Sequence, residues 1–203
     1  MPAFLHDCQH WVFDMDGTLT RAVHDFGYIR HQLKIPPEAD ILGHLDSLPA
    51  AESRAAHAWL FEHERELAEA SIPAPGAVEL VQHLYEHGHH LAILTRNAHE
   101  LARITLQAIG LAHCFTPQNT LGREQAAPKP APDGMLKIAR NWQVDSSKLC
   151  MIGDFHFDLT SARDAGSRAV LVNQPCNPWP ELTDHHAPDC SELLTLLQTS
   201  RTG

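Results

Sequence analysis

Short apolar runs alternate with amphipathic segments along most of this chain, and the alternation restricts the fold more than any other feature. Four apolar runs are typical of buried strands: 11–13, 91–94, 149–152 and 169–172. Apolar residues at helical spacing predict helices over 78–85, 101–109, 135–142, 159–165 and 193–197. Apolar strands that alternate with helices are typical of a parallel sheet covered on both faces. We therefore expect an α/β fold with a Rossmann-like parallel sheet flanked by helices.

Residues 20–73 interrupt this pattern with a stretch rich in Ala, Glu, His and Leu. Helices are predicted over 24–34, from Pro37 to about residue 48, and over 55–70. Pro37 fits the first turn of the second of these helices. No alternation of the kind found in strands occurs here. We expect a small all-helical insert at 20–73 within a core made of residues 1–19 and 74–203.

Charge and composition exclude several classes of protein. The chain has 15 Lys and Arg against 25 Asp and Glu, a formal net charge of -10. An acidic chain without a basic stripe is a poor binder of nucleic acid or of anionic membranes. No apolar run approaches the roughly 20 residues of a membrane span, and the N-terminus does not resemble a signal peptide. The five cysteines include no Cys-x-x-Cys pair, which favours a reduced, cytoplasmic chain.

Polar residues follow three of the predicted strands, where ligands bind in parallel sheets. They are Asp14 and Asp16 after the first strand, Thr95, Arg96 and Asn97 after the second, and Asp154 and Asp158 after the third. A further residue, Lys129, lies in a Pro-Lys-Pro loop before that third strand. We expect these side chains to meet at one edge of the sheet.

The carboxylates suggest a division of roles. Of two acids two residues apart, Asp14 and Asp16, one can attack a substrate while the other moves protons. Asp14, Asp154 and Asp158 would repel one another unless a cation such as Mg²⁺ bound among them. Plainer explanations remain: Asp-Gly is a common turn, and Asp154 could simply cap the helix that follows.

Three further residues are candidates for binding phosphate. Thr95 offers a hydroxyl at a strand end, although it could instead cap a helix. Arg96 follows it directly. Lys129 lies between prolines that stiffen its loop, and there it could neutralise a carboxylate and a phosphate together. The 16 His residues also invite a zinc site, but no Cys or Glu motif of zinc spacing accompanies them, so solvated surface His is the better interpretation.

Four segments resemble the motifs of the haloacid dehalogenase superfamily, on its phosphoglycolate-phosphatase-like branch: DMDGTLT at 14–20, LTRN at 94–97, KPAP at 129–132 and GDFHFD at 153–158. The resemblance implies a core of that family with a helical cap at 20–73. It implies Asp14 as nucleophile and Asp16 as general acid and base, with Thr95 and Lys129 on the phosphate. It also implies Mg²⁺ held by the Asp14 and Asp154 carboxylates and the Asp16 carbonyl, with Asp158 in support.

The function expected from these motifs is Mg²⁺-dependent hydrolysis of a small phosphorylated metabolite through an aspartyl phosphate, by a monomer or small homo-oligomer. Two alternatives stay open, a phosphomutase of the same fold and a non-enzymatic phosphate-binding protein. Five cap residues could read the leaving group or could be solvated: Arg21, His24, Tyr28, Arg30 and His31.

Overall fold

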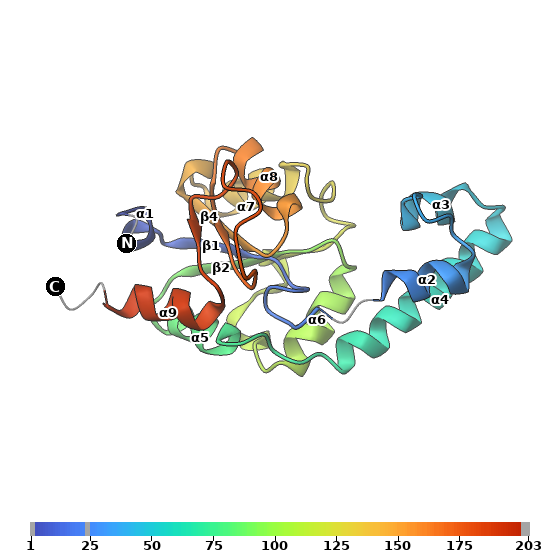
Figure 1. The fold of residues 1–203 in the computed structure, drawn as a ribbon, viewed down its shortest axis with the longest axis horizontal. Helices are drawn as coiled ribbons and strands as arrows, with labels where there is room; N and C mark the ends of the chain where they lie inside the picture. The colour runs from blue at the N-terminus through green and yellow to red at the C-terminus, as the bar shows by residue number, and fades with distance from the viewer. Residues whose placement is uncertain (1–2, 23–24, 200–203) are drawn as a thin grey trace.

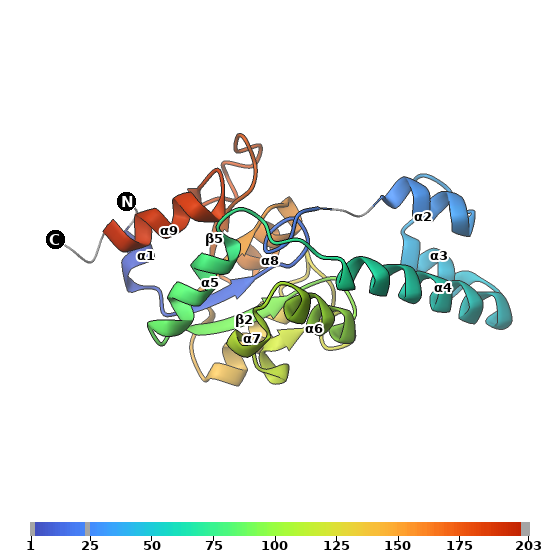
Figure 2. The same ribbon diagram turned by 90° about the horizontal axis from the view of Figure 1, so that it is seen from below.

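A six-stranded parallel sheet forms the centre of the molecule in the computed structural model, which describes residues 3–22 and 25–199 (Figures 1 and 2). The strands are β1 (His10–Phe13), β2 (His90–Leu94), β3 (Thr120–Leu121), β4 (Leu149–Gly153), β5 (Arg168–Leu171) and β6 (His185–His186). Their order is β3-β2-β1-β4-β5-β6, and each neighbouring pair is parallel. The expected α/β fold is therefore confirmed. Strands β3 and β6, of two residues each, are too short for a pattern search to find.

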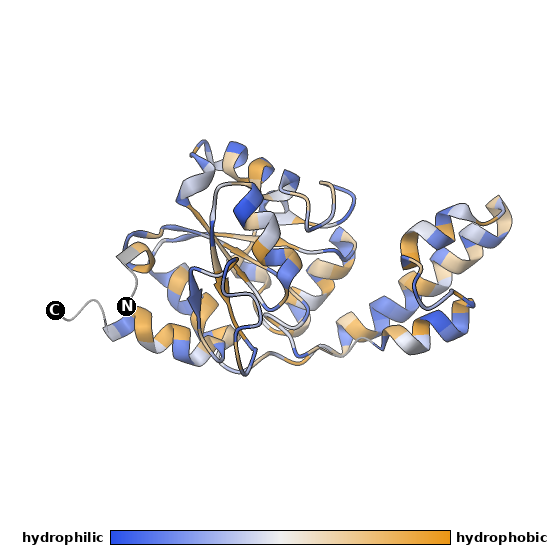
Figure 3. Cartoon of the chain, turned by 45° about the horizontal axis from the view of Figure 1, so that its top comes forward, coloured by the Kyte–Doolittle hydropathy of each residue, from blue (hydrophilic) through white to orange (hydrophobic). Residues whose placement is uncertain are grey.

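Helices cover both faces of the sheet. One face carries α5 (Ala77–Glu86), α6 (His99–Ala108) and α9 (Cys190–Thr199), while α7 (Asp133–Trp142) and α8 (His156–Asp164) lie on the other. Alternate residues of β1 separate the two cores, because Trp11 and Phe13 pack into the first and Val12 into the second. In Figure 3 hydrophobic colour is common along the central strands, and the helices around them mix hydrophobic and hydrophilic residues. The short helix α1 (Ala3–Asp7) was not foreseen.

Three further helices project from one side of this body: α2 (Phe26–Leu33), α3 (Ile41–Ser47) and α4 (Ala50–Glu69) (Figures 1 and 2). We refer to α2, α3 and α4 as the cap helices. They share a hydrophobic cluster separate from the two cores of the sheet, with buried Ile29, Ile35, Leu45 and Leu60. The cap helices are therefore held together by their own apolar contacts.

The boundaries of the cap helices differ from those expected. Helix α2 begins after Asp25, whose carboxylate accepts a hydrogen bond from Tyr28 N, and the expected start at residue 24 lies outside the described residues. Pro37 was expected in the first turn of a helix but lies in a turn, because Asp40 caps α3 and fixes its start. Helix α4 begins five residues earlier than expected, directly after Pro49.

The two connections between the cap helices and the sheet run side by side. Arg21 N donates to Ile72 O at 2.9 Å, and Ala74 N donates to Leu19 O at 2.9 Å. The first connection leaves the sheet just after β1, and α4 returns along α6. The cap helices are thus attached beside the end of β1. Among the described residues, no helix combines the length and the apolar character that crossing a membrane requires.

Leu45→Ala should loosen the cap helices without loosening the sheet. Leu45 is fully buried in the separate cluster, and a buried Leu→Ala change costs about 2–5 kcal/mol. We expect faster amide hydrogen exchange in α2 and α3, measured by mass spectrometry, while β1 and β4 keep their protection. As a control, Ile138→Ala in the core between the sheet and helices α7 and α8 should reduce the protection of β4. Equal loss of protection in sheet and cap for Leu45→Ala would show that the two clusters unfold together.

Candidate functional site

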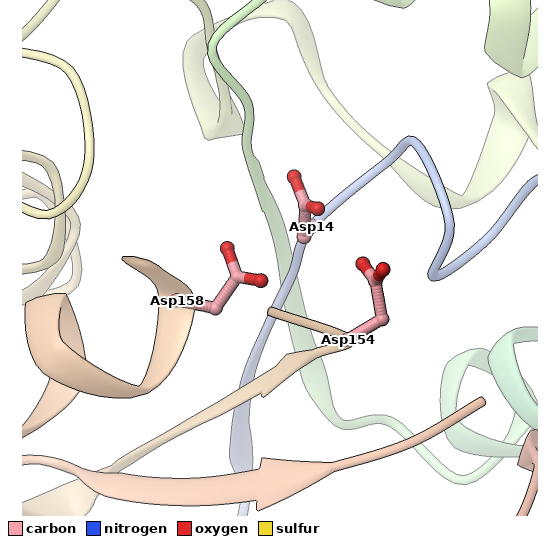
Figure 4. Close-up of side chains that lie close together, drawn as sticks. All are labelled: Asp14, Asp154 and Asp158. Atoms are coloured by element: carbon pink, nitrogen blue, oxygen red, sulfur yellow. The ribbon is translucent and has the colours of Figure 1, made fainter. Parts of the chain in front are cut away.

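Three aspartates converge beyond the carboxyl ends of β1 and β4. Asp14 follows β1, Asp154 follows β4, and Asp158 lies in the first turn of α8. Figure 4 shows their carboxylates gathered around one point. Each offers an oxygen, and these oxygens lie within 4.8 Å of one another. Residues 140 positions apart in the sequence thus share one site, as the sequence predicted.

Lys129 joins this cluster from the loop that precedes α7. Its ammonium donates hydrogen bonds to Asp14 Oδ1 at 2.5 Å and to Asp158 Oδ1 at 2.6 Å. The Lys129 side chain is only 3% exposed. Burial alone would lower the pKa of this lysine, but the two carboxylates raise it, so the ammonium stays charged.

Burial and mutual repulsion raise the pKa values of the three acids. The pKa of Asp14 rises to about 6 because the group is desolvated and faces Asp158, although Lys129 acts in the opposite direction. The pKa of Asp154 also rises to about 6, through burial and then the charge of Asp14. Desolvation raises the pKa of Asp158 as well. The ionised site is therefore short of positive charge.

The donor set fits a hard divalent cation. Three carboxylates and one ammonium leave two negative charges uncompensated, and carboxylate oxygens are ligands that Mg²⁺ prefers. Asp158 already accepts hydrogen bonds at both oxygens, from Lys129 and from Phe155 N, which suits a supporting role. Within the described part of the chain, this is the one group of three or more His, Cys, Asp or Glu side chains close enough to hold a metal ion.

The turn after β1 brings its backbone against Asp154. Gly17 has φ +85°, and a Cβ there would lie 2.4 Å from Asp154 Oδ2, so no other residue fits without displacing that carboxylate. Thr18 Oγ1 donates to Asp154 Oδ1 at 2.9 Å. Asn173, just beyond β5, holds the turn by donating to the carbonyls of Gly17 and Thr18 at 2.8 and 2.9 Å. This role of Asn173 was not predicted from the sequence.

Asn97 links two of the expected site residues. Its side-chain Nδ2 donates to Asp16 Oδ2 at 2.6 Å, and its backbone N donates to Thr95 Oγ1 at 3.1 Å. Asn97 was noted at the end of β2 but was given no role. Thr95 is buried, and the N-cap residue of α6 is Ala98, so Thr95 does not cap that helix. Thr95 instead lines the cavity beside the acidic cluster.

Arg96 points toward the cap helices. Its guanidinium lies 3.8 Å from Asp40 Oδ1 and 5.0 Å from the centre of the Phe157 ring. Its side chain is 45% exposed. The expected contact between Arg96 and phosphate stays a prediction.

The simple capping role considered for Asp154 is wrong. The N-cap residue of α8 is Phe155, and the Phe155 backbone N–H donates to Asp158 Oδ2 at 3.1 Å. Asp154 instead faces Thr18 and the other two acids. Its position is therefore explained by the acidic cluster and not by the helix.

A cavity of about 490 Å³ lies between the acidic cluster and the cap helices. Of the five cap residues considered as substrate contacts, Arg30 lines it, whereas Tyr28 packs against Trp59 and His63. His24 lies outside the described residues. The cavity thus has a charged end at the sheet and a second wall formed by the cap.

Magnesium should stabilise the protein more at neutral than at acidic pH. The pKa values of Asp14 and Asp154 rise on folding from 3.8 to about 6, so without metal these groups cost stability as the pH rises from about 4 to about 6. Mg²⁺ binds the ionised carboxylates and removes that cost. We expect the rise in Tm on adding Mg²⁺ to be larger at about pH 7.5 than at about pH 5. Asp154→Asn should diminish the effect, and an equal rise at both pH values would contradict the assignment.

Comparisons with known proteins identify a family for this chain. A family model described as haloacid dehalogenase-like hydrolase matches residues 9–166. An uncharacterized hydrolase of Saccharomyces cerevisiae is 30% identical over 92% of this chain and 89% of its own length. A phosphoglycolate phosphatase of Mesorhizobium japonicum is 27% identical over 80% of this chain and 81% of its own.

The fold has close counterparts among solved structures. A hydrolase from Pseudomonas syringae superposes with a TM-score of 0.75 at 24% identity, covering 94% of this chain and 98% of that one. Together with the family match, which spans β1, β2, β4 and the whole acidic cluster, this similarity places the chain among the haloacid dehalogenase-like hydrolases.

Proposed function

We propose that this hydrolase is a Mg²⁺-dependent phosphatase that acts on a small phosphorylated metabolite through an aspartyl phosphate. The observation that carries the proposal is the contact of the buried Lys129 ammonium with Asp14, beside two further carboxylates. A nucleophile, a fixed positive charge and a metal site are the groups that phosphoryl transfer requires. The phosphoglycolate phosphatase among the relatives supports the same class of reaction.

Asp14 is the proposed nucleophile, and its carboxylate attacks the phosphorus in line with the leaving oxygen. Lys129 lies against Asp14 Oδ1, where it offsets the charge of the incoming phosphoryl group. The Thr95 hydroxyl, which lines the same cavity, is the proposed donor to a phosphate oxygen. Asp14 and Asp154, together with the Asp16 carbonyl, would hold Mg²⁺, which supplies further neutralisation of the phosphate charge when bound.

Asp16 is the proposed general acid and base. It protonates the leaving alcohol when Asp14 is phosphorylated, and it later takes a proton from the water that hydrolyses the aspartyl phosphate. The Asn97 amide donates to Asp16 Oδ2 at 2.6 Å, so it fixes the direction of that carboxylate. Asn97 is therefore a proposed positioning residue.

Two alternatives stay separable by experiment. A phosphomutase would need a bisphosphate intermediate and a closed cap that excludes water, so it would release little inorganic phosphate. A non-enzymatic phosphate-binding protein would need neither Asp14 nor Asp16. Release of inorganic phosphate from monoesters, with Mg²⁺ present, distinguishes the phosphatase from both. The cytoplasmic location and the monomeric or small homo-oligomeric state stay predictions.

Asn substitutions should separate the roles of the two acids. Asp14→Asn removes the nucleophile, so activity should fall to background. Asp16→Asn should lose about 10²–10⁴-fold, the usual contribution of general acid–base catalysis. Because hydrolysis of the aspartyl phosphate then lacks its base, acid quenching with labelled substrate should trap label on Asp16→Asn and none on Asp14→Asn. Substantial turnover by Asp14→Asn would rule out covalent catalysis by that residue.

Asn97→Ala should impair proton transfer more than binding. Without the amide, the Asp16 carboxylate loses the partner that orients it, so we expect roughly ten-fold lower kcat for an alkyl phosphate. The loss should be smaller for p-nitrophenyl phosphate, whose leaving group needs little protonation. Asn141→Ala, on the exposed side of α7, is the matched control. An equal loss for both substrates would indicate a purely structural role for Asn97.

A further inference from the structure

The cavity beneath the cap helices is larger than a phosphate group and a two-carbon acid need. Its volume is about 490 Å³, within the range of roughly 300–1,000 Å³ found for sites that enclose drug-sized ligands. The phosphate end is fixed by the acidic cluster and Lys129. Most of the volume therefore remains for the leaving group.

Apolar and aromatic side chains form part of the wall around that volume. The cap contributes Phe26, Ile41 and Leu42, and the core contributes Phe155 and Phe157. Phe26 is 57% exposed and Phe155 is 42% exposed, although both line the cavity. Large apolar side chains left in contact with solvent gain free energy when a ligand covers them.

The aromatic wall on the core side is held in a defined geometry. The rings of Phe155 and Phe157 meet edge to face with centroids 5.1 Å apart, and Trp179 supports Phe155 at 5.4 Å. The Arg96 guanidinium lies 5.0 Å from the centre of the Phe157 ring. A planar guanidinium and these rings offer flat surfaces against which another ring can stack.

Two of the three arginines that line the outer part of the cavity are already paired with acids. Arg96 faces Asp40 at 3.8 Å, and Arg123 pairs with Glu64 at 3.3 Å, each pair joining the core to the cap. A carboxylate on the substrate would have to compete with Asp40 for Arg96 and with Glu64 for Arg123. The third arginine, Arg30, donates to the carbonyl of Ala39 at 3.3 Å.

We propose that this cavity selects phosphomonoesters whose leaving group carries an aromatic ring, over those whose leaving group carries a carboxylate or several hydroxyls. The selection rests on the proposed phosphatase activity and deepens it by assigning a substrate class. The ring lies between Phe26 of the cap and the Phe155–Phe157 wall of the core. Hydroxyl groups placed there would lose hydrogen bonds to water and find few partners among these side chains.

The test compares esters of alkyl alcohols, so that differences in leaving-group acidity stay small. The assay measures release of inorganic phosphate by the 203-residue chain with Mg²⁺ from four esters: 2-phenylethyl phosphate, ethyl phosphate, glycerol 3-phosphate and phosphoglycolate. We expect kcat/KM for 2-phenylethyl phosphate to exceed that of each of the others by roughly ten-fold or more, the scale on which apolar pockets discriminate.

Substitutions of Phe26 and Phe155 test whether the cavity walls cause the preference for an aromatic leaving group. Phe26→Ala and Phe155→Ala should lower kcat/KM for 2-phenylethyl phosphate and leave ethyl phosphate nearly unchanged. Both side chains are substantially exposed, so folding should be unaffected, and the Tm checks this. Tyr28→Ala is the matched control, because Tyr28 is an exposed aromatic residue of α2, the helix that carries Phe26, and does not line the cavity. This variant should leave kcat/KM unchanged for both substrates.

Failure of this inference and failure of the proposed function give different results. If phosphoglycolate or glycerol 3-phosphate is hydrolysed more efficiently than 2-phenylethyl phosphate, the aromatic preference is wrong and the phosphatase stands. The same holds if the ring gives no advantage over ethyl phosphate. If no ester releases phosphate above the Asp14→Asn background, the phosphatase proposal itself is wrong, and the preference falls with it.

Discussion

The buried ammonium of Lys129 makes the rest of the site possible. It is hydrogen bonded to Asp14 and Asp158 at once, in a position where almost no solvent reaches. If one member of a buried ion pair is removed, the other is left as an uncompensated charge, and this strongly destabilises the fold. Even with Lys129 present, the pKa of Asp14 is raised to about 6. The protein therefore maintains a cluster of acids whose repulsion a further cation would relieve, which is why the cluster suits the metal ion of the proposed function.

The parallel sheet explains how this cluster is assembled. Parallel strands end at a common edge, so the residues after β1, β2 and β4 become neighbours whatever their separation in sequence. The surrounding loops then fix the details: Gly17 allows the first turn to touch Asp154, and Asn173 holds that turn from beyond β5. The three acids are held by the strands of the sheet and the loops that follow them, whereas the cap helices carry their own small hydrophobic cluster. Because the two clusters are separate, substitutions within the cap cluster should leave the packing around the three acids unchanged.

The sequence predicted the acidic site well because its signals are local. One strand is followed by Asp-x-Asp-Gly, and another by Gly-Asp with a second Asp four residues later. These local motifs are enough to predict that the acids meet, because parallel strands end at a common edge of the sheet. Residues that act through another residue were missed, as Asn97 and Asn173 show. An Asn after a strand is an ordinary turn residue by sequence alone, and its partner is 81 residues away for Asn97 and 156 for Asn173. The start of α3 was misplaced for a related reason, since a carboxylate cap at Asp40 overrode the preference of Pro37 for a first turn.

By itself, the sequence determined the class of fold, the strand ends that carry the acids and the family to which the chain belongs. The spacing of the apolar residues encodes the strands and helices, and the short motifs after the strands encode the acids and the family. Only the tertiary structure decided which side chains line the cavity. Phe26 on the cap and Phe155 on the core are far apart in the chain, and both look like ordinary apolar residues in their own segments. They line one space because two separately packed units meet above the sheet edge. No local pattern encodes that meeting, since it arises from where the connections leave the sheet and from the ion pairs of Arg96 and Arg123 with the cap.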